Sequence, residues 1–66
     1  MDANSQQKVI AKGLVILRSD DQPNIRIKFK GPGTSEWKTF EKPFVSKAAR
    51  DRRMKELLEK PNYILD

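Results

Sequence analysis

The segment Ile25–Lys30 restricts the fold of this chain more than any other part of the sequence. Apolar residues alternate there with cationic ones, Ile25, Ile27 and Phe29 with Arg26, Lys28 and Lys30. Side chains that alternate with a period of two point to opposite faces of a β-strand. The segment therefore predicts a strand with one apolar face, which other elements must cover, and one cationic face.

Two further segments are expected to be strands on either side of it. Val9–Arg18 contains the continuous apolar run Leu14–Leu17, which is typical of a strand covered on both faces. Glu36–Phe44 carries three aromatic residues and ends near Pro43, which cannot donate a hydrogen bond to a sheet. Since the connections are short and rich in turn-forming residues, the three strands should pair as an antiparallel meander.

A helix is predicted after the strands. Ser46 is a suitable N-cap for a helix over about residues 47–60, and Pro61 would end it. The apolar segment Tyr63–Leu65 then either adds a short fourth strand or packs against the helix end. The expected fold class is therefore α+β, with a three-stranded antiparallel meander followed by one C-terminal helix (β-β-β-α).

With 66 residues, the chain is long enough for one small domain. We expect that domain over residues 8–66, after a polar, disordered N-terminal arm over residues 1–7. The helix should cover the apolar sheet face with one narrow stripe. The predicted core consists of Leu14, Ile16, Ile25, Ile27, Phe29, Phe40, Met54, Leu57, Leu58 and Ile64.

The composition argues against catalysis. The sequence has no cysteine and no histidine, so disulfides, the usual structural zinc sites, the commonest general base and the thiol nucleophile are all missing. Asp20 and Asp21 are interpreted as a solvated turn rather than a metal site. We expect no enzyme activity, no cofactor, no metal and no small-molecule substrate.

No segment of the sequence indicates a membrane protein. The longest apolar stretch, Val9–Leu17, is interrupted by Lys12 and Gly13 and is too short to span a bilayer. The first eight residues lack the apolar core of a signal peptide. The expectation is a cytoplasmic protein without a membrane partner.

Positive charge is concentrated in the middle of the chain. The net charge is +5, but residues 22–55 hold ten basic and three acidic residues, which gives that segment +7. Such an asymmetry is typical of proteins that bind an anionic partner. The candidate nucleic-acid-binding residues are Arg26, Lys28, Lys30, Trp37, Lys38, Arg50, Arg52 and Arg53.

The row of Arg26, Lys28 and Lys30 has two interpretations. Along a strand these side chains stand about 6.6–7 Å apart, comparable with the spacing of phosphates along a nucleic-acid strand. The sequence slightly favours the second interpretation, the solvated outer face of an amphipathic strand, because lysine and arginine are the commonest residues that keep a sheet face soluble. Around the helix, Arg50, Arg52 and Arg53 either contact phosphates or form ion pairs along a solvated surface.

Trp37 is also open to two interpretations. Its parity in a regular strand is opposite to that of Phe40, so both cannot face the core. If Phe40 is in the core, Trp37 lies on the cationic face and offers a platform for base stacking. Otherwise Trp37 is itself a core residue, or covers a contact between subunits.

Two functions of different classes follow. The first is a small basic module that binds DNA or RNA through a cationic sheet face and the helix arginines. The second is a protein-protein interaction module, or a small homo-oligomeric accessory or inhibitor protein. The second depends on the unpaired sheet edge and on Val15 and Leu17, which would form an exposed apolar patch unless Val9 and Tyr63–Leu65 cover them.

Overall fold

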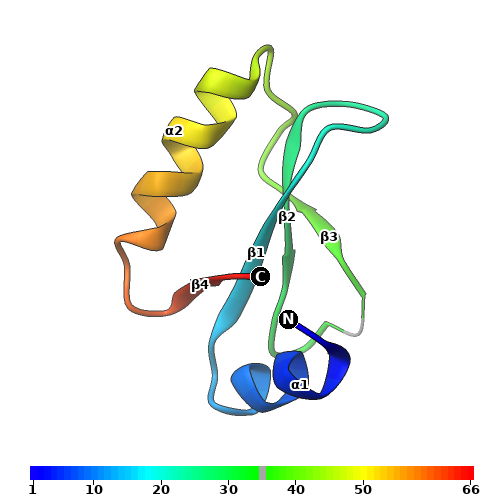
Figure 1. The fold of residues 1–66 in the computed structure, drawn as a ribbon, viewed down its shortest axis with the longest axis vertical. Coiled ribbons are helices and arrows are strands. Elements are labelled where there is room, and N and C mark those ends of the chain that lie inside the picture. Colours follow the sequence, from blue (N-terminus) through cyan, green and yellow to red (C-terminus); the bar gives the residue numbers. More distant parts are fainter. Residues whose placement is uncertain (35) are drawn as a thin grey trace.

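The computed structural model describes residues 1–34 and 36–66, which form a mixed sheet with two helices (Figure 1). In chain order the elements are α1 (Ala3–Ala11), β1 (Val15–Asp20), β2 (Arg26–Lys30), β3 (Lys38–Phe40), α2 (Lys47–Leu58) and β4 (Tyr63–Leu65). The expected α+β class is confirmed. So is the helix that begins after Ser46, whose hydroxyl accepts a hydrogen bond from the amide of Ala49 at 3.2 Å.

The strand order is β3-β2-β1-β4. β1, β2 and β3 form the predicted antiparallel meander. β4 pairs with β1 in parallel, because the chain returns to the sheet through α2. The segment Tyr63–Leu65 therefore adds a fourth strand, which makes the sheet mixed. The first and third strands are shorter than the segments predicted for them.

The register decides which side chains face α2. Leu17 lies opposite Phe29, and Ile27 lies opposite Phe40. With α2 these residues form the core, in which Leu17, Ile27, Met54 and Leu57 are buried. Three aromatic rings extend it through edge-to-face contacts, with centroid distances of 5.6 Å for Phe29–Phe40 and 5.9 Å for Phe40–Tyr63.

The prediction of a disordered N-terminal arm is wrong, because residues 3–11 form α1. Asp2 caps this helix by accepting a hydrogen bond from the amide of Ser5 at 2.8 Å. Val9 and Ile10 belong to α1 and not to the first strand. Gly13 then turns the chain with a φ of 86° before β1 begins.

The predicted parity of β1 is also wrong. Leu17 and Val15, not Leu14 and Ile16, face α2, and Leu17 is fully buried. Ile16 is fully buried as well, on the opposite face, where α1 packs against β1. The apolar patch expected at Val15 and Leu17 is therefore not exposed, and that argument for a docking surface is lost.

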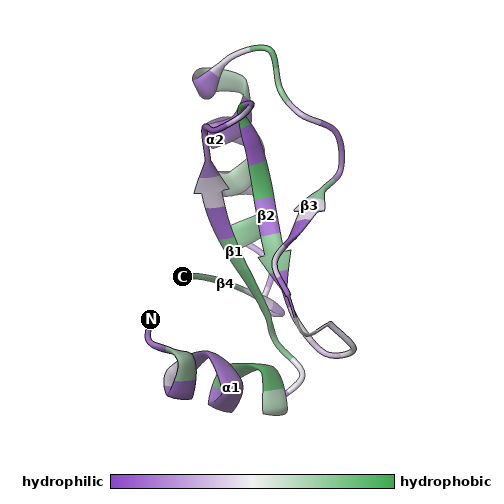
Figure 2. Cartoon of the chain, turned by 90° about the vertical axis from the view of Figure 1, so that its right-hand side faces the viewer, coloured by the Kyte–Doolittle hydropathy of each residue, from purple (hydrophilic) through white to green (hydrophobic). Residues whose placement is uncertain are grey.

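The rest of the predicted core is confirmed in part. Phe29, Phe40 and Leu58 are partly buried and pack against the buried cluster. Leu14, Ile25 and Ile64 are only partly buried and lie outside that cluster. Figure 2 shows the alternation of hydrophobic and hydrophilic residues along β2 that positions the core on one side.

Across residues 1–34 and 36–66, no helix has the length and apolarity that spanning a membrane requires.

Candidate nucleic-acid interface

One side of the sheet carries the cations of the two central strands. Arg18 of β1 lies opposite Lys28 of β2, and Asp20 lies opposite Arg26. These residues alternate with the side chains that face α2, so they stand on the other side of the sheet. We call this side the cationic face and define it by Arg18, Asp20, Arg26, Lys28, Lys30 and Trp37.

Asp20 holds Arg26 in place. Arg26 donates to Oδ2 of Asp20 from Nε at 3.1 Å and from Nη2 at 2.8 Å. Nζ of Lys28 lies 3.9 Å from the same oxygen. The hydrogen bond from Arg26 is the main reason that the pKa of Asp20 lies below its ordinary value. The expectation of a solvated turn is therefore wrong for Asp20, which belongs to β1.

Asp66 holds Arg18 in the same way. Arg18 donates to Oδ2 of Asp66 from Nε at 3.2 Å and from Nη2 at 2.7 Å. The other oxygen of Asp66 accepts a hydrogen bond from Gln6 at 3.1 Å and lies 3.5 Å from the ammonium group of Met1. Burial alone would raise the pKa of Asp66, but the hydrogen bonds from Arg18 and Gln6 outweigh it and the pKa is lowered.

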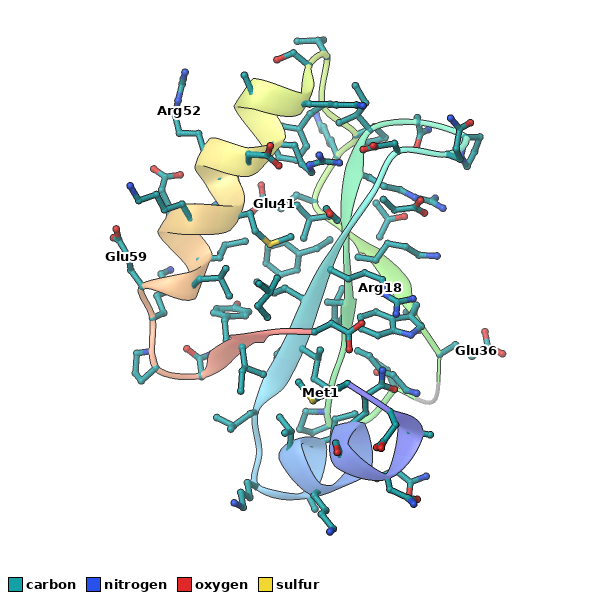
Figure 3. The ribbon with its side chains drawn as sticks, viewed as in Figure 1. Met1, Arg18, Glu36, Glu41, Arg52 and Glu59 are labelled. Carbon is teal, nitrogen blue, oxygen red and sulfur yellow. The ribbon has the colours of Figure 1, made fainter. Side chains whose placement is uncertain are left out.

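Trp37 lies on the cationic face, next to Arg18. The guanidinium carbon of Arg18 lies 4.2 Å from the centroid of the indole ring, a cation–π contact. Trp37 is partly buried by this packing and does not belong to the buried core cluster. Figure 3 shows Arg18 projecting from β1 on the side away from α2.

Lys30 stands at the end of the cationic face nearest α1. Its Nζ donates to the side-chain oxygen of Gln6 at 3.4 Å. Gln6 is buried although it is polar, because it bridges Lys30 and Asp66. Through Gln6, α1 therefore connects Lys30 of β2 with Asp66, which follows β4.

The structure does not place all eight predicted site residues together. Arg26, Lys28, Lys30 and Trp37 share the cationic face. Lys38 is exposed on β3 with the opposite parity, since it lies across from Phe29. The three arginines of α2 lie on a helix that covers the other side of the sheet (Figure 1).

Two of those helix arginines are engaged within the chain. Arg50 is only 5% exposed and donates to the carboxylates of Asp21 and Asp51. Arg53 donates to Oε1 of Glu41 from Nε at 2.9 Å and from Nη2 at 2.7 Å. Arg52 is exposed and forms no ion pair within residues 1–34 and 36–66 (Figure 3).

Sequence reasoning missed Arg18, Gln6 and Asp66 as parts of this site. Arg18 and Ile16 are two residues apart and therefore point to the same side of β1. This spacing identifies the side only when the pairing of β1 with β2 is known. Gln6 and Asp66 lie 60 positions apart in the sequence, and only the packing of α1 near β4 joins them. No local pattern in the sequence connects these residues.

Residues 1–34 and 36–66 contain no group of three or more acidic, histidine or cysteine side chains that could hold a metal ion. A shallow groove of about 320 Å³ lies between α2 and the β1–β4 edge, and its lining includes Met54, Leu58 and Leu65.

No family model, curated protein or solved structure matches this chain.

Proposed function

We propose that this protein binds nucleic acid through the cationic face, without catalysing a reaction. The observation that carries the proposal is the placement of Arg18, Arg26, Lys28, Lys30 and Trp37 on the sheet face opposite α2, where α1 packs at the Lys30 end. A phosphate backbone is the biological polyanion that such a row of cations suits.

The cationic face keeps a net positive charge after its ion pairs are counted. Its four cationic side chains stand beside the carboxylates of Asp20 and Asp66, which leaves a net charge of +2 for these six groups. Lys28 and Lys30 are strand neighbours two residues apart, about 6.6–7 Å along the strand. They can therefore contact successive phosphates of one strand. Arg50 and Arg53 are outside the proposed contact because they lie on α2, which covers the opposite side of the sheet.

A salt titration of binding tests this function. The single tryptophan, Trp37, lies on the proposed surface, so its fluorescence reports binding directly. Single- and double-stranded DNA and RNA are titrated from low to physiological salt. We expect binding that persists at physiological salt, with a log-log slope that reflects release of several counterions. Binding confined to low salt would show only the general attraction of a basic protein, and would contradict the proposal.

A matched pair of triple variants localises the contact. In the first, Arg26, Lys28 and Lys30 are changed to glutamine. In the control, the exposed residues Lys12, Lys42 and Lys60 are changed to glutamine, which removes the same charge elsewhere. We expect the first variant to lose at least about tenfold in affinity, and its salt slope to fall by up to about three, while the control keeps most of both.

Circular dichroism of both variants shows whether they are folded. Equal losses in two folded variants would mean that net charge, not the cationic face, drives binding. Absence of binding by the unmodified protein would instead favour a protein partner or self-association. Sedimentation over a range of concentrations would then measure the oligomeric state.

A further inference from the structure

A groove lies between α1 and the turn that joins β2 to β3, at the Lys30 end of the cationic face. Its volume is about 350 Å³, and it is lined by Gln7, Ile10, Ala11, Lys30 and Thr34. α1 lies beside the end of β2 that leads into this turn (Figure 1). A volume of this size is at the lower end of the range for small-ligand sites, so the groove suits one compact group. Since Lys30 belongs to both, a ligand on the cationic face can reach into the groove.

The turn forms a wall of the groove that is fixed in the free protein. The amide of Thr34 donates to the carbonyl oxygen of Gly31 at 3.0 Å, and the amide of Gly31 donates to Oγ1 of Thr34 at 2.9 Å. Gly31 is buried against β1, where an added Cβ atom would lie 3.1 Å from Cγ2 of Val15. Because hydrogen bonds and close packing both hold the turn, little ordering is needed there when a ligand binds.

Gln6 fixes the other wall, which is α1. Its side-chain nitrogen donates to Asp66 at 3.1 Å, and its side-chain oxygen accepts from Nζ of Lys30 at 3.4 Å. Ile10 and Ala11 follow Gln7 by three and four residues, so the three are neighbours on one side of the helix. The helix therefore presents one amide and two apolar side chains to the groove.

The lining has the chemistry of a site for an unpaired base. Ile10 and Ala11 offer an apolar surface to the ring, and the exposed amide of Gln7 can donate to and accept from the base edge. Lys30 uses one of its three donors on Gln6 and keeps two for a phosphate beside the base. Among the described residues, no carboxylate lines the groove. Two apolar side chains are too few to cover the hydrocarbon chain of a lipid.

A base can enter this groove only from a single strand. In a duplex the base faces are stacked and the edges are paired, so a base becomes available only when it is unpaired. β1 and β2 lie between β3 and β4, so the sheet meets a ligand as a broad face and not as a ribbon that a duplex groove admits. The arrangement therefore fits a flexible strand that places one base beside α1.

Arg18 is the second cation that such a strand can reach. Its side chain is 42% exposed, compared with 20% for Arg26 and 25% for Lys28. Lys30 lies opposite Ile16, so Arg18 and Lys30 are diagonal neighbours across β1 and β2, about 7–8 Å apart. This separation allows the two side chains to contact neighbouring phosphates of one strand.

We propose that the groove between α1 and the β2–β3 turn binds one unpaired base of a single-stranded nucleic acid, and that Lys30 and Arg18 contact the phosphates beside that base. The proposal rests on the proposed function and adds the class of nucleic acid and a site for its base. Gln7, Ile10 and Ala11 contact the base.

Three probes of matched length test the proposal. The first is a mixed-sequence DNA single strand of about ten nucleotides, within the range that small single-strand-binding domains cover. The second is a strand of abasic sugars, which keeps every phosphate and removes every base. The third is the first strand annealed to its complement. A dye at one end of the strand reports binding by fluorescence anisotropy at physiological salt. We expect the first strand to bind at least about tenfold more tightly than the other two probes.

Ala11→Leu and Ala48→Leu form a matched pair of variants. Both alanines are exposed helix residues, but only Ala11 lines the groove. Leucine at position 11 fills the groove without adding a charge or an aromatic ring. Ala11→Leu should therefore bind the base-containing and abasic strands nearly equally, whereas Ala48→Leu keeps the difference of about tenfold. Lys30→Gln should weaken binding of both strands alike and reduce the salt slope by about one.

Nuclear magnetic resonance of the unmodified protein provides a second measurement that needs no variant. The amide signals of Gln7, Ala11 and Thr34 should shift when the base-containing strand is added, and should stay nearly unchanged with the abasic strand. Shifts confined to signals outside the groove would overturn the proposal.

The affinities can overturn it as well. Equal binding of the base-containing and abasic strands by the unmodified protein would mean that phosphates suffice. A duplex that binds as tightly as the single strand would exclude the unpaired base. A folded Ala11→Leu variant that still prefers bases would place the base elsewhere, for example on Trp37. Each of these results leaves the proposed function standing, whereas failure of all three probes to bind would contradict the proposed function itself.

Discussion

The guanidinium group of Arg50 donates to the carboxylate of Asp21 and so ties α2 to the turn that follows β1. The side chain of Arg50 is only 6% exposed, whereas that of Asp21 is 40% exposed. Nζ of Lys47 lies 3.4 Å from the other oxygen of Asp21. The hydrogen bond from Arg50 is the main reason that the pKa of Asp21 is lowered. Arg50 therefore has a structural role in the packing of the helix.

Replacing Arg50 by glutamine should destabilise the protein. The variant loses the ion pair with Asp21 and leaves a polar group in a nearly buried position. We expect the midpoint of thermal unfolding to fall by at least about 5 °C. Arg52→Gln, at an exposed site on the same helix, should leave the midpoint nearly unchanged. Equal midpoints for the two variants would show that the Arg50–Asp21 pair does not hold α2.

The sequence predicts β2 and α2 because each has a strong local signal, and it offers β4 as one of two alternatives for the segment Tyr63–Leu65. The alternation along Ile25–Lys30 sets one face toward the core, Ser46 caps the helix, and Pro61 stands between the helix and the apolar segment Tyr63–Leu65. For these elements the local preference and the final packing agree. The meander also follows from short connections alone.

Two features could not be predicted locally. A helix of nine residues such as α1 is marginal by itself, so its formation depends on packing against β1, which the sequence does not display. The run Leu14–Leu17 is apolar at every position, so the sequence does not show which of its side chains face α2. The pairing of β1 with β2 places Leu17 on that side. Arg18 joins the cationic face for the same reason. The shared face of Arg26, Lys28 and Lys30 could be predicted because β2 has a clear alternating pattern.

Truncation of Leu57 should measure the strength of the core. Leu57 is 1% exposed and packs with Leu17 and Ile27. Leu57→Ala should lower the free energy of unfolding by about 2–5 kcal/mol, since a cavity adds to the lost transfer energy. Leu65→Ala removes the same atoms from a side chain that is 56% exposed and should cost much less. Urea unfolding compares the two. A similar loss at both positions would mean that the core is not centred on α2.

Substitution of Gly13 should reveal the cost of its backbone conformation. Gly13 has a φ of 86°, and a Cβ atom added there would meet no atom within 4 Å. Gly13→Ala should therefore cost about 1–2 kcal/mol through backbone strain alone. Gly13→Asn should cost less, because asparagine tolerates this region better. Thermal unfolding of the two variants decides the matter, and an alanine variant as stable as the unmodified protein would contradict a left-handed residue between α1 and β1.

Removal of Arg18 should change the environment of the tryptophan. In Arg18→Ala the ring of Trp37 loses the guanidinium that lies 4.2 Å from its centroid. We expect the emission maximum to shift to longer wavelength and quenching by acrylamide to increase, with a stability loss of about 1 kcal/mol or less from the cation–π contact. Arg26→Ala is the control, since Arg26 is held by Asp20. Identical spectra for the two variants would contradict the Arg18–Trp37 contact.

Acid should destabilise the fold below about pH 4. The pKa values of Asp20, Asp21 and Asp66 all lie below their ordinary value in the folded protein, so these carboxylates bind protons more readily when the chain unfolds. Their stabilising contribution is complete above the unfolded pKa of about 3.9 and is lost as the pH falls through the lower folded pKa. Urea midpoints should therefore change little between about pH 5 and 7 and decline below about pH 4.

Asp66→Asn isolates one carboxylate in the same measurement. The amide keeps the shape of the side chain but cannot form the ion pair with Arg18, so the variant should be less stable at neutral pH. The gap between the two proteins should close as the pH falls, because protonation of Asp66 removes the same interaction from the unmodified protein. A gap that stays constant down to about pH 2 would show that the charge of Asp66 does not stabilise the fold.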